Sequence, residues 1–187
     1  MKQVWKPSNL LAPVPAVLVT VRDPEGNDNV LTIAWAGTVC SDPAMVSISV
    51  RKERFSYPMI AESGEFVINL VNRELLTAAD YCGVRSGRQE DKFAALGLEK
   101  APASAVRAPI LAASPVNLEC RVTKILPLGS HDMFLAEIVA VDVDEKLVDG
   151  NGRLMLEEAG LISYIHGGYF EQGPCRGTFG FSVRKRK

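Results

Sequence analysis

The chain has 187 residues, of which 47% are apolar, and its formal net charge is −1 at pH 7. This composition excludes a disordered chain and predicts one globular domain over residues 1–187, with its core over about residues 10–172. The near-neutral charge gives no sign of a nucleic-acid partner or of binding to an anionic membrane surface.

The two ends of the chain and its cysteines bear on the cellular compartment expected for the protein. Prolines interrupt the apolar stretch over residues 1–19, so we expect neither a signal peptide nor a membrane span. The basic residues at 184–187 predict a solvated tail. The cysteines form no CxxC pair, which predicts neither a zinc site nor a disulfide framework and fits a reducing, cytoplasmic compartment. They are Cys40, Cys82, Cys120 and Cys175.

The first half of the chain predicts strands and two short helices. Valine-rich residues 16–21 and residues 30–39 flank a turn cluster at 23–28, which predicts a hairpin. Residues 45–50 alternate apolar side chains with Ser47 and Ser49, so they predict a strand whose serine face is either solvated or lines a ligand. Helical spacing occurs over 54–61 and 74–81, with a strand over 65–70 between them.

The second half of the chain is also rich in strand patterns. Residues 91–96 predict one or two helical turns, residues 116–126 and 133–143 two long strands, and residues 161–165 a short one. There is no internal repeat and no long linker. Several strands with few helices between them argue against a doubly wound parallel sheet and favour a mainly β fold, an antiparallel barrel with peripheral helices.

Residues 29–54 carry more hydroxyl and basic side chains than core strands need. Hydroxyls and guanidinium groups suit a phosphate dianion, and flat side chains suit a planar ring. Two simpler alternatives remain open: the basic residues form a solvated strand end, and Trp35 is an ordinary core residue. The residues concerned are Thr32, Trp35, Thr38, Ser47, Ser49, Arg51, Lys52 and Arg54.

Several short motifs occur in an order and at a spacing that resemble one family. They are Pro13-x-Pro15, Thr32-Ile33-Ala34-Trp35-x-Gly37, Asp42-Pro43, Arg54-x-Ser56, the stretch from Gly64 to Leu70, Ser86-Gly87, Asp91-Lys92-Phe93, His131-Asp132 and Gly168-Tyr169-Phe170. Together they resemble the flavin reductase-like, FMN-binding split-barrel family over residues 14–170. The forms at Trp35 and Arg54 are most similar to its flavoredoxin-like branch.

The resemblance implies a Greek-key-like split β-barrel that binds FMN at the interface of a homodimer. It implies an NAD(P)H:flavin oxidoreductase, in which NADH or NADPH passes hydride to flavin and electrons go on to a small-molecule acceptor or a redox partner protein. The alternative is an FMN-containing electron-transfer protein with no nicotinamide activity of its own. A weaker alternative is a ligand-binding barrel without flavin.

Site residues are carried over from the resemblance one by one. The ring and ribityl chain would lie along Thr32, Ala34, Trp35, Gly37 and Thr38. Ser49, Val50, Arg51 and Lys52 would follow the chain toward the phosphate, which Arg54 and Ser56 would bind. Arg85 and Ser86 would approach the ring or its entrance. His166, which is not carried over in this way, precedes Gly167-Gly168 and is either structural or lies on the flavin side.

A few residues near this site have open or structural interpretations. Lys92 could fall near the flavin entrance, and Asn29 is expected to close the hairpin turn. Cys82 is expected to be a small buried residue, and His131 is either structural or close to the flavin. We expect no catalytic side chain, because the flavin would carry the chemistry. We expect no metal, because the chain has only two histidines and neither has an acidic partner at metal-ligand spacing.

Overall fold

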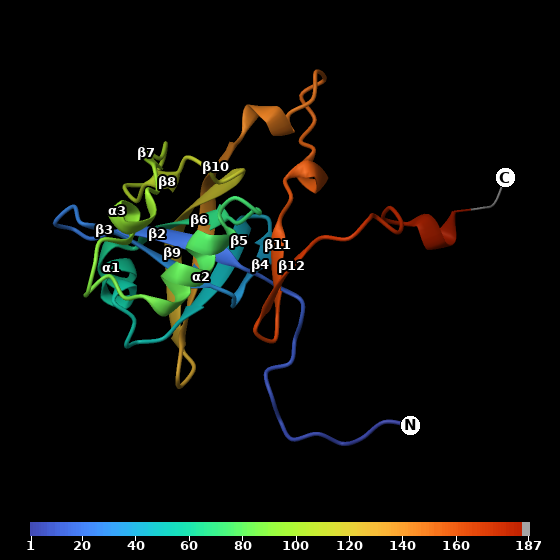
Figure 1. The fold of residues 1–187 in the computed structure, drawn as a ribbon, viewed down its shortest axis with the longest axis horizontal. Helices are drawn as coiled ribbons and strands as arrows, with labels where there is room; N and C mark the ends of the chain where they lie inside the picture. Colours follow the sequence, from blue (N-terminus) through green and yellow to red (C-terminus); the bar gives the residue numbers. More distant parts are fainter. Residues whose placement is uncertain (185–187) are drawn as a thin grey trace.

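The computed structural model describes residues 1–184, so all but Arg184 of the predicted basic tail lies outside the described residues. Its main element is a seven-stranded sheet in the order β3-β2-β6-β9-β10-β5-β4 (Figure 1). Every neighbouring pair of these strands is antiparallel. The strands are β2 (Val17–Arg22), β3 (Asp28–Ile33), β4 (Ala36–Ser41), β5 (Ala44–Val50), β6 (Glu65–Leu70), β9 (Val116–Pro127) and β10 (Asp132–Val143).

The connection between β3 and β4 shows that this sheet curls into a barrel. The two strands are opposite edges of the sheet, yet only Ala34 and Trp35 join them. Three peptide units reach at most about 11 Å, whereas the edges of a flat seven-stranded sheet lie about 29 Å apart. The two edges must therefore approach each other at this link, into which the pairing of β4 with β5 continues: the Ser49 amide donates a hydrogen bond to the Trp35 carbonyl at 2.9 Å.

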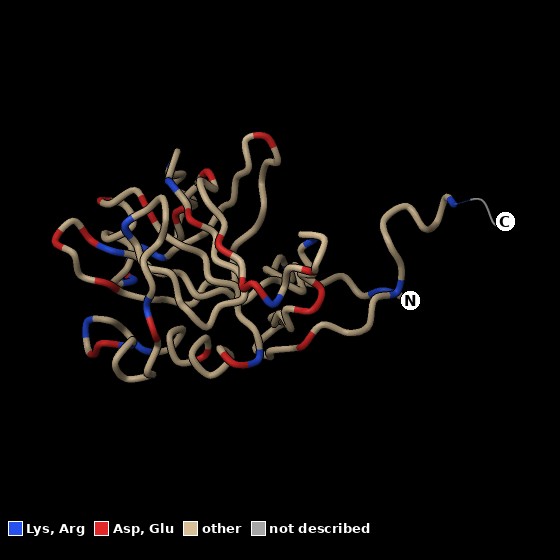
Figure 2. Tube along the Cα trace, turned by 90° about the horizontal axis from the view of Figure 1, so that it is seen from above, with Lys and Arg blue, Asp and Glu red and all other residues tan. Residues whose placement is uncertain are grey.

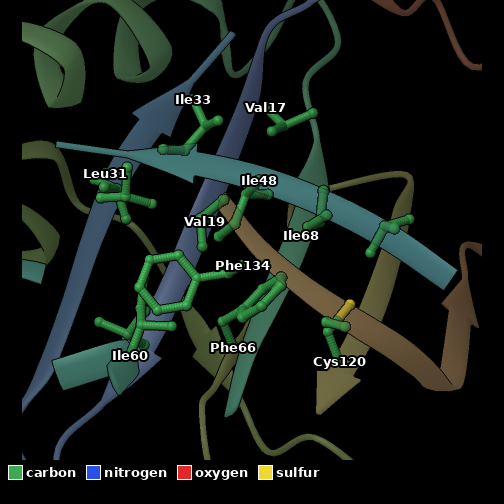
Figure 3. Close-up of a cluster of buried hydrophobic side chains, with 14 of the residues drawn as sticks. Val17, Val19, Leu31, Ile33, Ile48, Ile60, Phe66, Ile68, Cys120 and Phe134 are labelled. Carbon is green, nitrogen blue, oxygen red and sulfur yellow. The ribbon is translucent and has the colours of Figure 1, made fainter. Parts of the chain in front are cut away.

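Apolar side chains from the strands fill the barrel. Val17 and Val19 of β2 point inward with Phe66 and Phe134, and Ile60 closes one end (Figure 3). The intervening residues of β2 are buried too, because helices cover its outer face. The buried side chains packed there are Leu18, Val30, Leu75, Ala79, Cys82 and Phe93. A strand buried on both faces explains why residues 16–21 lack polar alternation.

Three short helices lie outside the barrel (Figure 1). They are α1 (Ser56–Ser63), α2 (Leu76–Val84) and α3 (Lys92–Leu96). Two small sheets accompany them: β7 (Lys100–Ala101) with β8 (Ile110–Leu111), and β1 (Val14–Pro15) with β11 (Ile162–Ile165) and β12 (Gly168–Glu171). Single 3₁₀ turns occur at Glu145–Leu147, Leu156–Glu158 and Phe181–Val183. No helix of the described residues is long and apolar enough to cross a membrane.

Two extended arms, residues 1–13 and 172–184, leave the barrel on the same side (Figures 1 and 2). Several large apolar side chains on them are exposed, Leu11 to 88% and Phe179 to 105% of their reference areas. The arms therefore bury little apolar surface against their own barrel.

Most expected elements are confirmed, and two need correction. The sequence predicts a single strand over residues 30–39, but the strand is interrupted at Ala34 and Trp35. The interruption is where the chain passes from one sheet edge to the other. The first predicted helix begins at Ser56 rather than at residue 54 and ends at Gly64, whose backbone is left-handed with φ 67°.

Candidate functional site

A cavity of about 530 Å³, here called the basic cavity, lies where β3, the end of β5, the start of α1 and the loop after α2 meet. Five cationic side chains line it and Glu53 is the one acid among its lining residues. The cations are Arg51, Arg54, Arg85, Arg88 and Lys92. Such an excess of positive charge favours an anionic ligand, and guanidinium groups match phosphate oxygens well.

The inner wall of the basic cavity includes two buried polar residues, Asn29 and Ser56. The Asn29 side-chain amide donates to the Ser56 hydroxyl at 2.6 Å, so the hydroxyl hydrogen of Ser56 is free to donate in turn. Ser56 is the first residue of α1, and no side chain caps this helix end. Its first N–H groups therefore add positive potential at the cavity.

The loop after α2 closes against the cavity because residue 87 is glycine. A Cβ atom there would lie 2.5 Å from Asn29 Oδ1 and 2.7 Å from a ring carbon of Phe55. The next residue, Arg88, lies with its guanidinium carbon 5.8 Å from the centroid of the Phe55 ring. It also donates to the Glu53 carbonyl at 3.1 Å, which ties the loop to the end of β5.

Cys82 also lines the basic cavity but is not a reactive thiol there. It is almost completely buried, as the sequence predicts, and burial raises its pKa to about 11. At neutral pH the thiol is therefore protonated and is neither a nucleophile nor an anion.

A narrower cavity of about 150 Å³, here called the indole cavity, adjoins the basic cavity and shares Arg51 and Arg54 with it. Trp35 lines it, and its ring centroid lies 4.4 Å from that of His131. Burial, with the nearby charge of Arg51, lowers the pKa of His131, so the ring is neutral at pH 7. The indole cavity is thus narrow, with the flat, uncharged rings of Trp35 and His131 on its wall and Arg51 and Arg54 where it adjoins the basic cavity.

Most of the predicted site residues come together around these two cavities. The indole cavity is lined by Thr32, Ala34, Trp35, Ser49, Val50, Arg51 and Arg54, and the basic cavity by Arg51, Arg54, Ser56, Arg85 and Ser86. The Thr32 hydroxyl donates to the Ala79 carbonyl of α2, so toward the cavity it can only accept.

The structure places four predicted site residues elsewhere. Lys52 lies 3.4 Å from an oxygen of Asp132, outside both cavities. Gly37 and Thr38 are exposed on the edge strand β4, where they pair with β5. His166, at φ 48°, lines a third cavity of about 500 Å³ that also includes Trp35 and the N-terminal arm.

Other lining residues were not assigned to the site from sequence. Asn29 does not close the hairpin turn with its side chain, which instead bonds Ser56. Arg88 and Phe55 were missed, although the stretch at 84–89 is visibly rich in glycine and arginine. Within residues 1–184 there is no group of three or more His, Cys, Asp or Glu side chains that could hold a metal ion.

Comparison with known proteins identifies the family. The family model described as flavin reductase like domain matches residues 11–170, and the chain therefore belongs to this family. This confirms the resemblance found in the sequence. The split barrel predicted from it is also confirmed, by the sheet and by the similar structures described next.

Three individual proteins illustrate the similarity. Flavoredoxin of Desulfovibrio vulgaris (Miyazaki F) is 31% identical, with a TM-score of 0.91 over 98% of this chain and all of that one. A putative flavin reductase with split barrel domain from Shewanella frigidimarina shares the fold, at 22% identity and a TM-score of 0.81 over 91% of this chain and 88% of that one. An uncharacterized protein of Archaeoglobus fulgidus is 32% identical over 65% of this chain and 69% of its own length.

Proposed function

We propose that the protein binds FMN, with the phosphate in the basic cavity and the isoalloxazine ring beside Trp35 in the indole cavity. The observation that carries this proposal is the direct junction of the two cavities at Arg51 and Arg54. A phosphate monoester joined to a flat ring is the kind of ligand that such a pair of cavities suits. Similarity to a protein named flavoredoxin supports it.

The described residues fit FMN in charge and in hydrogen bonding. Arg51 and Arg54 would neutralise the phosphate, and the Ser56 hydroxyl would donate to it. Trp35 and neutral His131 would give the ring a flat wall without adding charge. Bound FMN would supply the redox chemistry, and the protein would supply binding, orientation and the local electrostatic field.

We further infer that NADH or NADPH reduces the bound flavin and that the electrons pass to a small acceptor or a redox partner protein. Membership of a family described as flavin reductase like supports this more than the alternative, an electron carrier without nicotinamide activity. Anaerobic titration separates the two. Bleaching of the flavin by NADH or NADPH within seconds supports the reductase, whereas bleaching by dithionite alone supports the electron carrier.

Arg54→Ala tests the proposed phosphate site, with Lys52→Ala as a matched control. The two cations are close in sequence, but only Arg54 lines the cavities. Loss of one charged hydrogen-bonding partner costs roughly 1.5–3 kcal/mol, or about one to two decades of FMN affinity. Riboflavin, which lacks the phosphate, should be affected much less, and Lys52→Ala should change neither affinity. Equal loss of FMN and riboflavin affinity in a fluorescence titration of Arg54→Ala would exclude this placement.

We also infer that two copies of the chain associate, with the flavin close to their interface. Trp35, Val39 and Phe170 are each exposed to between 44% and 49%, and the arms add further exposed apolar side chains. Light scattering should give about twice the 20.3 kDa chain mass. A flavin-loaded species of one chain mass at micromolar concentration would contradict a shared site.

A further inference from the structure

Residues 102–109, here called the strap, lie over the outer face of β9 and are held there by a buried carboxylate. The strap is the loop of the β7–β8 hairpin, whose two strands have only two residues each. Glu119 of β9 is completely buried and lies between two residues that pack into the barrel, so its side chain points outward. It accepts from the amides of Ser104, Ala105 and Val106 and from the Ser104 hydroxyl, at 2.6–2.9 Å. Four hydrogen bonds of the strap therefore converge on this one side chain.

Asp142 of β10 lies beside Glu119 on the same outer face. Asp142 is opposite Asn117 in the pairing of β9 with β10, and Asn117 is two residues from Glu119, so the two acids are diagonal neighbours. Asp142 Oδ2 is buried, and within residues 1–184 no group donates a hydrogen bond to it. The two carboxyl groups are themselves close enough to share a hydrogen bond. An ionised Asp142 would thus place a second buried negative charge next to the first, with one oxygen lacking a donor.

The charged groups around this pair are engaged with other partners. Arg107 of the strap and Arg121 of β9 each lie 3.5 Å from a carboxylate oxygen of Glu65. Asp144, just beyond the end of β10, accepts from the Lys146 amide at 3.0 Å. In the part of the chain that the structure describes, no basic side chain lies within 4.0 Å of either acid of the pair. The pair therefore has no cation to compensate a second negative charge.

We infer that one proton, carried by Asp142 and shared with the Glu119 carboxylate, keeps the strap closed, and that loss of this proton at higher pH opens the strap. Glu119 is the anion of the pair, because the four donors of the strap favour its charged form. The pKa directions support this assignment. Burial and the charge of Glu119 raise the pKa of Asp142, whereas the pKa of Glu119, which burial alone would raise, is lowered by its hydrogen bonds. The strap lines neither cavity of the proposed flavin site, so this property goes beyond the proposed function.

Opening of the strap would let water reach both carboxyl groups and would uncover apolar contacts beneath it. Val106 and Ala108 of the strap pack against Val67 of β6. Because the folded-state pKa of Asp142 is raised above the unfolded value of about 3.9, its stabilising contribution is present below that value and is lost as the pH rises through the folded-state pKa. A strap that depended on Glu119 alone would do the reverse, since its hydrogen bonds strengthen when Glu119 ionises and then remain at higher pH.

The test is Asp142→Asn, whose side-chain amide is neutral and can donate to Glu119 at every pH. Glu137→Gln is the matched control, because it removes an exposed acid from the same strand. Hydrogen exchange of the Ala105 and Val106 amides, which donate to Glu119, is measured as protection factors from about pH 4 to about pH 8. We expect protection to fall about tenfold or more over this range in wild type and in Glu137→Gln, and to stay level in Asp142→Asn.

Each result decides for or against the shared proton, and none of the measurements uses flavin. Protection that stays level in wild type, or that falls equally in Asp142→Asn, overturns the inference. A level profile in Glu137→Gln also overturns it, because the overall charge of the sheet would then be responsible. A second measurement needs no variant: the side-chain carboxyl carbon of Asp142 is titrated by NMR in wild type. A midpoint above about 3.9 supports the inference, and a midpoint at or below it overturns the inference even if Asp142→Asn does not fold.

Discussion

The region beneath residues 104–106 and the basic cavity each contain a completely buried charge, but they treat it in opposite ways. Glu119 accepts four hydrogen bonds from its own chain, two from Ser104 and one each from the amides of Ala105 and Val106, at 2.6–2.9 Å. Lys92 has a single long one. The hydrogen bonds to the Glu119 carboxylate hold residues 104–106 in place. The Lys92 ammonium, which has only one long hydrogen bond, faces the basic cavity instead.

The pKa of Glu119 also indicates that its carboxylate is stabilised by its own chain. Burial by itself would raise the pKa of the carboxyl group, but the hydrogen bonds from residues 104–106 outweigh it and the pKa is lowered. Because the folded-state pKa lies below the unfolded one, Glu119 contributes stability that is present above the unfolded pKa of about 4.3 and is lost as the pH falls.

Of the changes considered, Glu119→Gln is expected to lower the free energy of unfolding most. A glutamine amide would direct N–H groups at backbone amides that already donate, so buried donors would lose their acceptor. We expect a loss of about 3 kcal/mol in the free energy of unfolding at pH 7, measured by urea denaturation of the ligand-free protein. Glu157→Gln, which breaks an exposed pair with Arg153 at 3.0 Å, should cost less than about 1 kcal/mol. If Glu119→Gln and Glu157→Gln lost similar free energies of unfolding, the hydrogen bonds to Glu119 would be no more stabilising than an exposed ion pair.

A smaller effect is expected for Gly87→Ala, which disturbs the basic cavity and not the Glu119 region. The added methyl group cannot fit between Asn29 and Phe55, so the loop that carries Arg85 and Arg88 must shift outward. We expect a destabilisation of about 1–3 kcal/mol, together with weaker FMN binding. Gly26→Ala, at a turn where a Cβ has no neighbour within 4 Å, should weaken FMN binding little. Unchanged FMN affinity in Gly87→Ala would show that the loop does not close the site.

The smallest expected effect is that of pH on the buried ammonium of Lys92. Burial lowers the pKa of Lys92, an effect that Arg54 reinforces and that Cys82 and Glu90 oppose. The penalty of the buried ammonium is therefore complete below its folded-state pKa and disappears as the pH rises toward the unfolded value of about 10.4. The free energy of unfolding of the ligand-free protein, measured by urea denaturation, should therefore gain a contribution from Lys92 as the pH rises through this window. Replacing Lys92 by Met should remove this contribution, and the same gain in Lys92→Met would assign the effect to another group.

Much of the fold could be predicted because its signals are local. The alternation of Ser47 and Ser49 with apolar neighbours locates β5, and the turn cluster at 23–28 locates the first hairpin. The interruption at Ala34 and Trp35 has no comparable signal. It follows from closure of the barrel, which depends on hydrogen bonds between strands far apart in the sequence.

The sequence indicates the candidate site where it places basic side chains that core strands do not need, as at Arg51 and Arg54, which line both cavities. Lys52 looks equivalent in the sequence but is directed to Asp132, a partner 80 residues away. Glu119 was not singled out, because one carboxylate in a strand resembles an ordinary solvated position. Its partners are backbone amides 13–15 residues earlier, which no side-chain pattern reveals.

Only Ala34 and Trp35 link the two edges of the barrel, so the number of residues between β3 and β4 determines the geometry of the site. Trp35 lies in this link, its carbonyl extends the pairing of β4 with β5 into the link, and its indole lines the adjoining cavity. An insertion after Ala34 would relax the tether that draws β3 and β4 together, and the aromatic wall would move with it. We therefore expect a residue inserted between Ile33 and Ala36 to disturb the site more than one inserted in a loop far from the seam.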